Sequence, residues 1–180
     1  MTILLKGSQQ GRGALVQNYS ATQQAPVAAT RTYITGSALK VPVGGLKVGS
    51  KFKWRFNMAK TAAGTETSTF DISVGVAGTT ADTARVSFTK PAGTAAADEG
   101  FVEITAVVRS VSATGVLVGN FALTHNLAAT GHAQIPSVNV TTVSAAHDNS
   151  AEELYVGVNI TTGAADAITI ELVDSELSIP

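Results

Sequence analysis

The stretch KFKWRFNMAK, residues 51–60, alternates between apolar and polar side chains. Successive side chains of a β-strand point to opposite faces, so a period of two gathers the apolar side chains on one face. The apolar residues are Phe52, Trp54, Phe56 and Met58, and the residues between them are Lys51, Lys53, Arg55 and Asn57. We therefore predict a strand with one core face, on which Trp54 is buried, and one largely cationic face.

The same period recurs along most of the chain. Strand-like runs separated by turn-forming residues occupy 68–77, 84–90, 101–110, 115–124, 137–144, 153–161 and 166–174, and two shorter runs lie within 31–42. No segment has the apolar spacing of an amphipathic helix. The sequence thus predicts an all-β protein, an antiparallel β-sandwich built as an eight-stranded jelly roll with an extended N-terminal arm. An immunoglobulin-like sandwich has a similar number of strands, but its Cys…Trp…Cys pattern is absent.

The composition narrows the functional classes. Charged residues make up 14% of the chain and the net charge is −1, against about 25% charged residues in an average soluble domain. This balance gives no general attraction to nucleic acid or to anionic lipid, so we expect neither as a partner. The chain has no cysteine, which excludes disulfides and thiolate metal sites. Neither a signal peptide nor a membrane span is predicted.

The first thirty residues differ from the rest because no regular period runs through them. Two small apolar islands, Leu4-Leu5 and Leu15-Val16, are separated by Gly, Gln and Ser. Such a segment buries too little apolar area to order itself alone. We therefore expect residues 1–30 to form an extended arm that lies on a surface, such as that of another chain, and residues 31–180 to form the sandwich. The alternative is that the segment packs on its own domain.

No pattern of catalytic or metal-binding residues emerges. The three histidines, His125, His132 and His147, have no metal-ligand spacing, and the acidic segment HDNSAEE (147–153) lacks the order of a calcium loop. GSQQGRG (7–13) is not a phosphate-binding loop, and no serine lies in a G-x-S-x-G motif. We expect no enzyme activity, no metal and no cofactor.

Four short motifs carry a resemblance to a known class of protein. They are K-T-A-A-G-T at 60–65, F-D-I at 70–72, G-T-x-x-D-T-A at 78–84 and T-x-P-A-G-T-A at 89–95. Together with the aromatic-alternating strand before them, they resemble a module in structural proteins of tailed bacteriophages. The resemblance is clear over about fifty residues and implies a virion protein, made in the host cytoplasm, with no catalytic residue to carry over.

Within that class, the composition and the arm favour a capsid decoration or cement protein that binds the major capsid protein. Proteins of this kind often sit as trimers on the capsid lattice, and this similarity implies that the chain also binds itself, as a homotrimer. The candidate contact residues are Leu4, Leu5, Arg12, Leu15, Val16, Tyr19, Lys51, Lys53 and Arg55. The three cations would face an acidic capsid surface or a neighbouring protomer. Alternatively, they belong to a solvated strand whose charges prevent unwanted edge pairing.

Two other functions remain open. One is a tail or head-fibre component, although the chain shows no repeated shaft. The other is a carbohydrate-binding β-sandwich on the virion surface, which would bind a surface glycan. Such modules stack sugars on exposed aromatic side chains, and the candidates here are Tyr19, Tyr33 and Tyr155.

Overall fold

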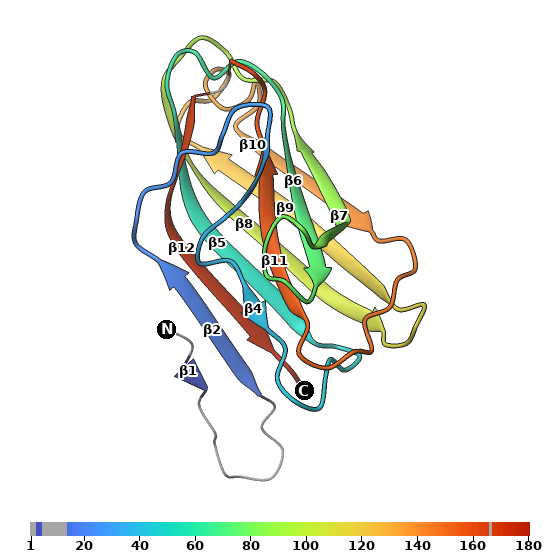
Figure 1. Cartoon of the computed structure of the whole chain (residues 1–180). Helices are drawn as coiled ribbons and strands as arrows, with labels where there is room; N and C mark the ends of the chain where they lie inside the picture. Colours follow the sequence, from blue (N-terminus) through green and yellow to red (C-terminus); the bar gives the residue numbers. More distant parts are fainter. Residues whose placement is uncertain (1–2, 5–13, 166) are drawn as a thin grey trace.

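The computed structural model describes residues 3–4, 14–165 and 167–180, which form two antiparallel sheets lying face to face (Figure 1). The seven-stranded sheet contains, in spatial order, β1 (Ile3–Leu4), β2 (Leu15–Ser20), β12 (Ile168–Ser178), β5 (Lys51–Lys60), β8 (Asp98–Ser110), β9 (Val116–His125) and β10 (Ser137–Val143). The five-stranded sheet contains β3 (Arg31–Tyr33), β11 (Tyr155–Thr161), β6 (Ser68–Gly75) and β7 (Thr83–Lys90), and β4 (Leu39–Lys40) also pairs with β11. Among the described residues, no helix is long and apolar enough to cross a membrane.

The strand pairs are nested in the order of a jelly roll. β2 pairs with β12, β3 with β11, β5 with β8, and β6 with β7, so each pair encloses the next in the sequence. Contacts of β12 with β5 and of β11 with β6 join these pairs within each sheet. The predicted antiparallel sandwich and its jelly-roll order are confirmed. The eight nested strands are not the eight expected, because β9 and β10 extend one sheet beyond β8, while β2 and β3 complete the roll.

The N-terminal segment therefore differs from the expected arm where the structure describes it. Strand β2 pairs along its whole length with β12, and the Val16 side chain is only 3% exposed. For residues 15–20 the alternative holds: the segment packs on its own domain, as the first strand of the roll. Hydrogen bonding to β12 and burial of Val16 supply the energy that its sequence alone could not. Residues 1–2 and 5–13 lie outside the described residues.

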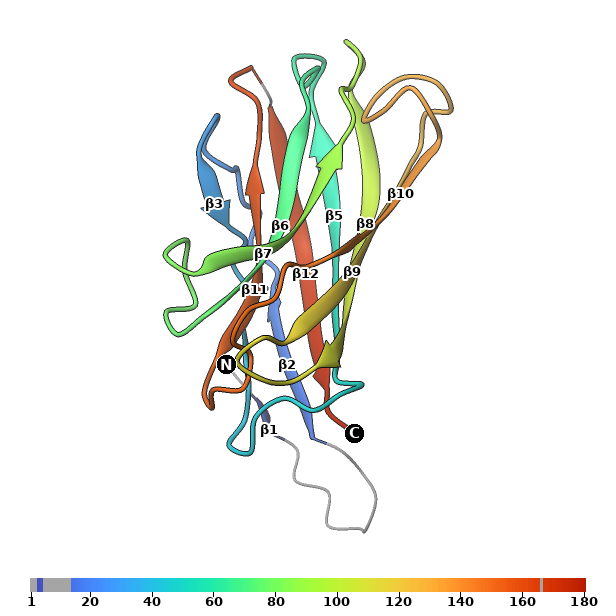
Figure 2. The same ribbon diagram turned by 90° about the vertical axis from the view of Figure 1, so that its right-hand side faces the viewer.

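The core lies between the sheets, and aromatic side chains fill its centre. Trp54 is fully buried, as predicted, and its indole nitrogen donates a hydrogen bond to the Ser37 carbonyl at 2.8 Å. The Phe70 and Phe121 rings approach to 5.1 Å between centroids across the two sheets. Each large apolar side chain that is removed from water stabilises the fold by about 1.5–3 kcal/mol. Figure 2 shows β6, β7 and β11 in front of β5, β8 and β12.

Candidate functional site

The outer face of the seven-stranded sheet, which points away from the other sheet, brings together five of the nine predicted contact residues. Cross-strand register places them in three successive rows over β2, β12 and β5. The rows are Leu15–Ser178–Lys51, Gln17–Glu176–Lys53 and Tyr19–Asp174–Arg55. Sequence periodicity assigns the three β5 cations to one face of their strand, but only the strand order shows that they share a surface with Leu15 and Tyr19.

Of the other four predicted contact residues, Val16 is the one whose side chain the structure describes, and it does not join this surface. Val16 points inward and belongs to the core. The backbone of Leu4 pairs with Val16 in the β1–β2 ladder. Leu5 and Arg12 lie outside the described residues. The apolar pair at 15–16 is thus divided, with Leu15 outward and Val16 inward, as the period of a strand requires.

The cations of β5 have acidic neighbours within their own chain. Lys53 Nζ lies 2.7 Å from a Glu103 carboxylate oxygen, and Arg55 Nε lies 3.9 Å from both Glu103 and Asp174. These pairs are partly exposed, so each contributes little to stability. β5 lies between β12 and β8, and the idea that its charges protect a sheet edge is therefore wrong. We call this region over β2, β12 and β5 the charged half of the outer face.

A group of residues on β9 and β10, together with two residues of β8, has a different character, and we call this group the uncharged half. Its members, from β8, β9 and β10, are Thr105, Val107, Val118, Asn120, Ala122, Asn139, Thr141 and Val143. Val107 is 38% exposed and Val143 49% exposed. The Asn120 amide donates to the Asn139 side-chain oxygen at 2.6 Å and to the Thr141 hydroxyl at 3.1 Å. The outer surface here thus has a polar centre with apolar side chains beside it.

A shallow hollow of about 500 Å³ lies where this half adjoins the exposed Arg109 of β8. It is lined by Val48, Gly49, Thr105, Val107, Val108, Arg109, Val118, Gly119, Asn120 and Thr141. Val48, at its margin, is 63% exposed. Valine side chains exposed this close together are more typical of a contact surface than of a solvated one. Sequence reasoning missed this half, because its residues look like ordinary strand formers until the register places them side by side.

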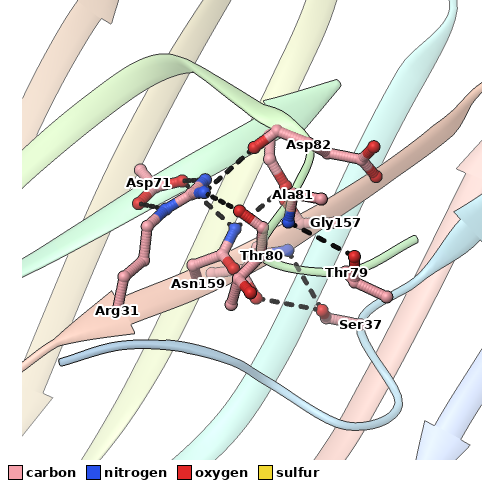
Figure 3. A network of polar contacts seen from close by, with 11 residues as sticks. Arg31, Ser37, Asp71, Thr79, Thr80, Ala81, Asp82, Gly157 and Asn159 are labelled. Carbon is pink, nitrogen blue, oxygen red and sulfur yellow. Dashed lines mark hydrogen bonds and ion pairs between the residues drawn. The ribbon is translucent and has the colours of Figure 1, made fainter. Parts of the chain in front are cut away.

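A second polar region covers the outer side of the five-stranded sheet (Figure 3). The Arg31 guanidinium binds both carboxylate oxygens of Asp71, at 2.6 and 3.0 Å, and donates to the carbonyls of Thr80 and Asp82. The buried Asn159 amide also donates to Asp71, at 3.2 Å. This bidentate pair ties β3, β6 and the β6–β7 loop together, so its donors are used within the fold.

Asp82 closes the β6–β7 loop on itself. Its carboxylate accepts hydrogen bonds from the backbone amides of Ala77 and Gly78, at 2.9 and 2.7 Å.

Burial, and then the nearby Asp82 charge, raises the pKa of Tyr33 to about 12, so its phenol stays neutral. Of the three tyrosines considered as sugar platforms, Tyr19 is 62% exposed, whereas Tyr33 and Tyr155 are partly buried.

Two buried lysines organise the loops at one end of the sandwich. The Lys60 ammonium donates to the carbonyls of Thr61, Thr94 and Ala96. The Lys90 ammonium, which is fully buried, donates to the carbonyls of Pro91 and His132 at 2.8 and 3.1 Å. Each ammonium thus satisfies carbonyl groups from loops that are distant in sequence.

Asp98 completes this end of the molecule. Its carboxylate contacts His125 Nδ1 at 2.7 Å and accepts from the backbone amides of His132 and Glu99. Burial raises the pKa of Asp98, but these hydrogen bonds outweigh burial and hold the pKa below its ordinary value. Burial also lowers the pKa of His132 to about 4. The His125 and Asp98 side chains are both fully buried, so the pair is shielded from solvent.

The motifs that carry the sequence resemblance have structural roles in this fold. Lys60 and Lys90 are the lysines of K-T-A-A-G-T and of the T-x-P-A-G-T-A turn, Asp71 is the acid of F-D-I, and Asp82 is the acid of G-T-x-x-D-T-A. A side chain at Gly93 would come within 2.6 Å of the Gly64 carbonyl oxygen, so the two lysine loops touch at their glycines. The two lysines hold loops together. The sequence could have predicted that Lys60 and Lys90 are buried, because each follows the core residues of its strand at the same spacing of two.

Metal binding finds no support in the described ranges, where no group of three or more His, Asp or Glu side chains is placed to hold an ion. His147 is buried and separate from His125 and His132, and burial lowers its pKa. The acidic segment that contains it forms a turn in which Asp148 accepts from the amide and hydroxyl of Ser150.

No family model matches this sequence, and no curated protein matches it. Solved structures of similar outline include arcelin-5, a lectin-like defence protein from Phaseolus vulgaris, at 10% identity and a TM-score of 0.42 over 100% of this chain and 99% of that one. A lectin from Bauhinia forficata in complex with GalNAc has 8% identity and a TM-score of 0.36 over 99% and 87%. A Shewanella oneidensis MR-1 protein of unknown function has 11% identity and a TM-score of 0.36 over 99% and 75%. Similarities this distant carry no argument about ligands.

Proposed function

We propose that this protein is a structural component of a tailed-bacteriophage virion, a cement or decoration protein that binds and stabilises the outer surface of the capsid. The observation that carries the proposal is the outer face of the seven-stranded sheet, where five predicted contact residues adjoin an exposed uncharged surface. The motif resemblance supports the same class. In this proposal the protein is not an enzyme, resides on the virion surface and assembles as a homotrimer.

The two halves of the outer face would contribute differently to capsid binding. The uncharged half would supply affinity, because removing its valines from water is favourable and its amide network is already formed. In the charged half, Lys53 and Arg55 already have acidic neighbours. They would therefore set orientation and association rate more than affinity, and that contribution would weaken with salt.

Sedimentation with undecorated capsids of the phage that encodes this chain tests the proposal. We expect the full-length protein to co-sediment, and Val107→Glu with Val118→Glu to abolish co-sedimentation, because two carboxylates would have to be buried at the contact. Lys51→Glu with Lys53→Glu should weaken binding in a salt-dependent manner. Thr89→Glu, on the other sheet, is the matched control and should bind like the unmodified chain.

The outcome also separates the alternatives. If the unmodified chain does not bind capsids, the cement proposal is overturned, and a tail or head-fibre role or a glycan-binding role takes its place. A version that lacks residues 1–13 tests the N-terminal contribution. Truncation at residue 30 would remove β2 and so would report on folding, not on an arm.

A further inference from the structure

Strand β10 forms one margin of the seven-stranded sheet and has no neighbour on its outer side among the described residues. Figure 2 shows it as the last strand beyond β8 and β9. Its sequence, SVNVTTV, contains no charged residue and no proline. Natural proteins usually protect a free edge with charges, proline or a covering segment, because an uncharged edge pairs readily with another strand. β10 has none of these protections within its own length.

The backbone groups at this edge can be assigned from the hydrogen bonds at the two ends of the strand. The His125 amide donates to the Pro136 carbonyl, and the Ser144 amide donates to the Leu117 carbonyl. Antiparallel pairing alternates, so the even-numbered residues between them direct their amides and carbonyls to β9. The odd-numbered residues direct theirs outward. They are Ser137, Asn139, Thr141 and Val143, and all four are exposed.

The other sheet margins are less available. At the opposite margin of the same sheet, β1 pairs with part of β2, at Val16 and Gln17. In the five-stranded sheet, β7 carries Arg85. The hydroxyl of Thr32, in β3, accepts a hydrogen bond from the Val27 amide of the preceding loop. β10 is thus a sheet margin that carries no charged residue and, among the described residues, has no further strand on its outer side.

We propose that β10 pairs with β10 of a second copy of this chain, as a two-fold antiparallel contact that joins the two seven-stranded sheets into one. The edge is self-complementary when the two-fold axis passes beside Val140. Asn139 of one copy then lies opposite Thr141 of the other, and Ser137 lies opposite Val143. All outward amides and carbonyls of both strands are paired in this register. The proposal goes beyond capsid binding and needs no capsid for its test.

The absence of cysteine in the native chain makes a disulfide test clean. In this register the two Val140 residues form a non-hydrogen-bonded pair, with Cα atoms about 4.5 Å apart, which suits a disulfide. We expect Val140→Cys to form a covalent dimer under mild oxidation at least ten-fold faster than Thr89→Cys, a control on the outer strand of the other sheet. Equal rates for the two variants would overturn the proposal.

The mass of the native assembly gives a second measurement that does not depend on cross-linking. Sedimentation equilibrium should show a dimer, or a hexamer if a three-fold contact also forms. Thr141→Lys places like charges on either side of the axis and should convert these species to monomer or trimer without changing the circular dichroism spectrum. A native monomer, or an assembly whose mass Thr141→Lys leaves unchanged, contradicts the β10 pairing.

Discussion

At the scale of single residues, the buried ionisable side chains at one end of the sandwich are the least ordinary feature. Lys90 is fully buried and Lys60 is 4% exposed, and both donate to backbone carbonyls of loops. An ammonium group removed from water needs such partners, because its desolvation is otherwise costly. The carbonyls need the ammonium equally, since each buried acceptor that loses its donor destabilises the fold.

Replacing Lys90 by methionine tests this dependence. Lys90→Met keeps the apolar stem but leaves the Pro91 and His132 carbonyls without this donor, so we expect a loss of about 1–3 kcal/mol in the free energy of unfolding. Chemical denaturation measures it, with the exposed Lys51→Met as the control that should unfold like the native protein. Equal stability of both variants would show that the buried ammonium has no stabilising role.

His132 predicts a dependence of stability on pH. Its pKa in the folded protein is about 4, below the ordinary value of about 6.5. The unfolded chain therefore binds a proton that the folded chain does not. This contribution to stability is complete above about pH 6.5 and is lost as the pH falls towards 4, by roughly 2–3 kcal/mol.

Denaturation between pH 7 and pH 4 measures this effect, and His132→Gln is the comparison. Glutamine can still donate to the Met58 carbonyl, which His132 Nε2 contacts at 2.9 Å, but it does not titrate. The variant should lose less stability than the native chain over this interval, although Asp98 adds a further loss at the acidic end. Parallel curves for the two proteins would exclude His132 as the titrating group.

At the scale of the elements, β2 and β5 show how neighbours decide what a strand does. β5 is the strand predicted most directly by its sequence, and it lies in the middle of the sheet. β2 has a weaker pattern, yet it is the first strand of the jelly roll because β12 offers it a hydrogen-bonding edge. Its inward residue Val16 joins the core, and its outward residues join the outer face.

Substitutions at Val16 and Gln17 test whether residues 15–20 form a packed strand or a loose arm. Val16→Asp places a carboxylate in the core, and we expect it to lower the free energy of unfolding by more than about 3 kcal/mol or to prevent folding. Gln17→Lys, on the exposed face beside Glu176, should leave the melting temperature nearly unchanged. If both variants melt like the native protein, β2 is not part of the stable fold in solution.

At the scale of the whole molecule, the two sheets approach closely where β9 crosses the other layer. A Cβ atom at Gly119 would lie 2.7 Å from the Phe88 ring, 2.9 Å from Val86 and 3.3 Å from Ile72. Three side chains from β6 and β7 thus occupy the space above this glycine. The absence of a side chain at one position of β9 helps to set the local spacing of the sandwich.

Gly119→Ala tests that spacing. The added methyl group must push the β6 and β7 side chains aside, so we expect a loss of roughly 1–3 kcal/mol in the free energy of unfolding. Ala122→Ser, on the outer face of the same strand, is the control and should have little effect. A stability gain for Gly119→Ala would mean that strand stiffening outweighs the contact.

The sequence alone determined the fold class and the two faces of most strands. A period of two, with apolar residues in phase, allows a strand that buries one face, and this placed Trp54 and its neighbours in the core. The same period placed the β5 cations on an outward face, whereas the outward positions of Leu15 and Tyr19 follow only from the pairing of β2 with β12. Periodicity is a property of one strand's own residues, so the two faces of a strand can be predicted without knowing its neighbours.

Only the tertiary structure decided which strands are neighbours. The Lys53–Glu103 contact, the union of β2 with β12, the loops gathered around Lys60 and Lys90, and the free edge of β10 all join residues that are distant in sequence. Strand pairing at such separations depends on the complete hydrogen-bonding pattern and on packing of both sheets at once, because a strand's own residues specify its faces but not its partner.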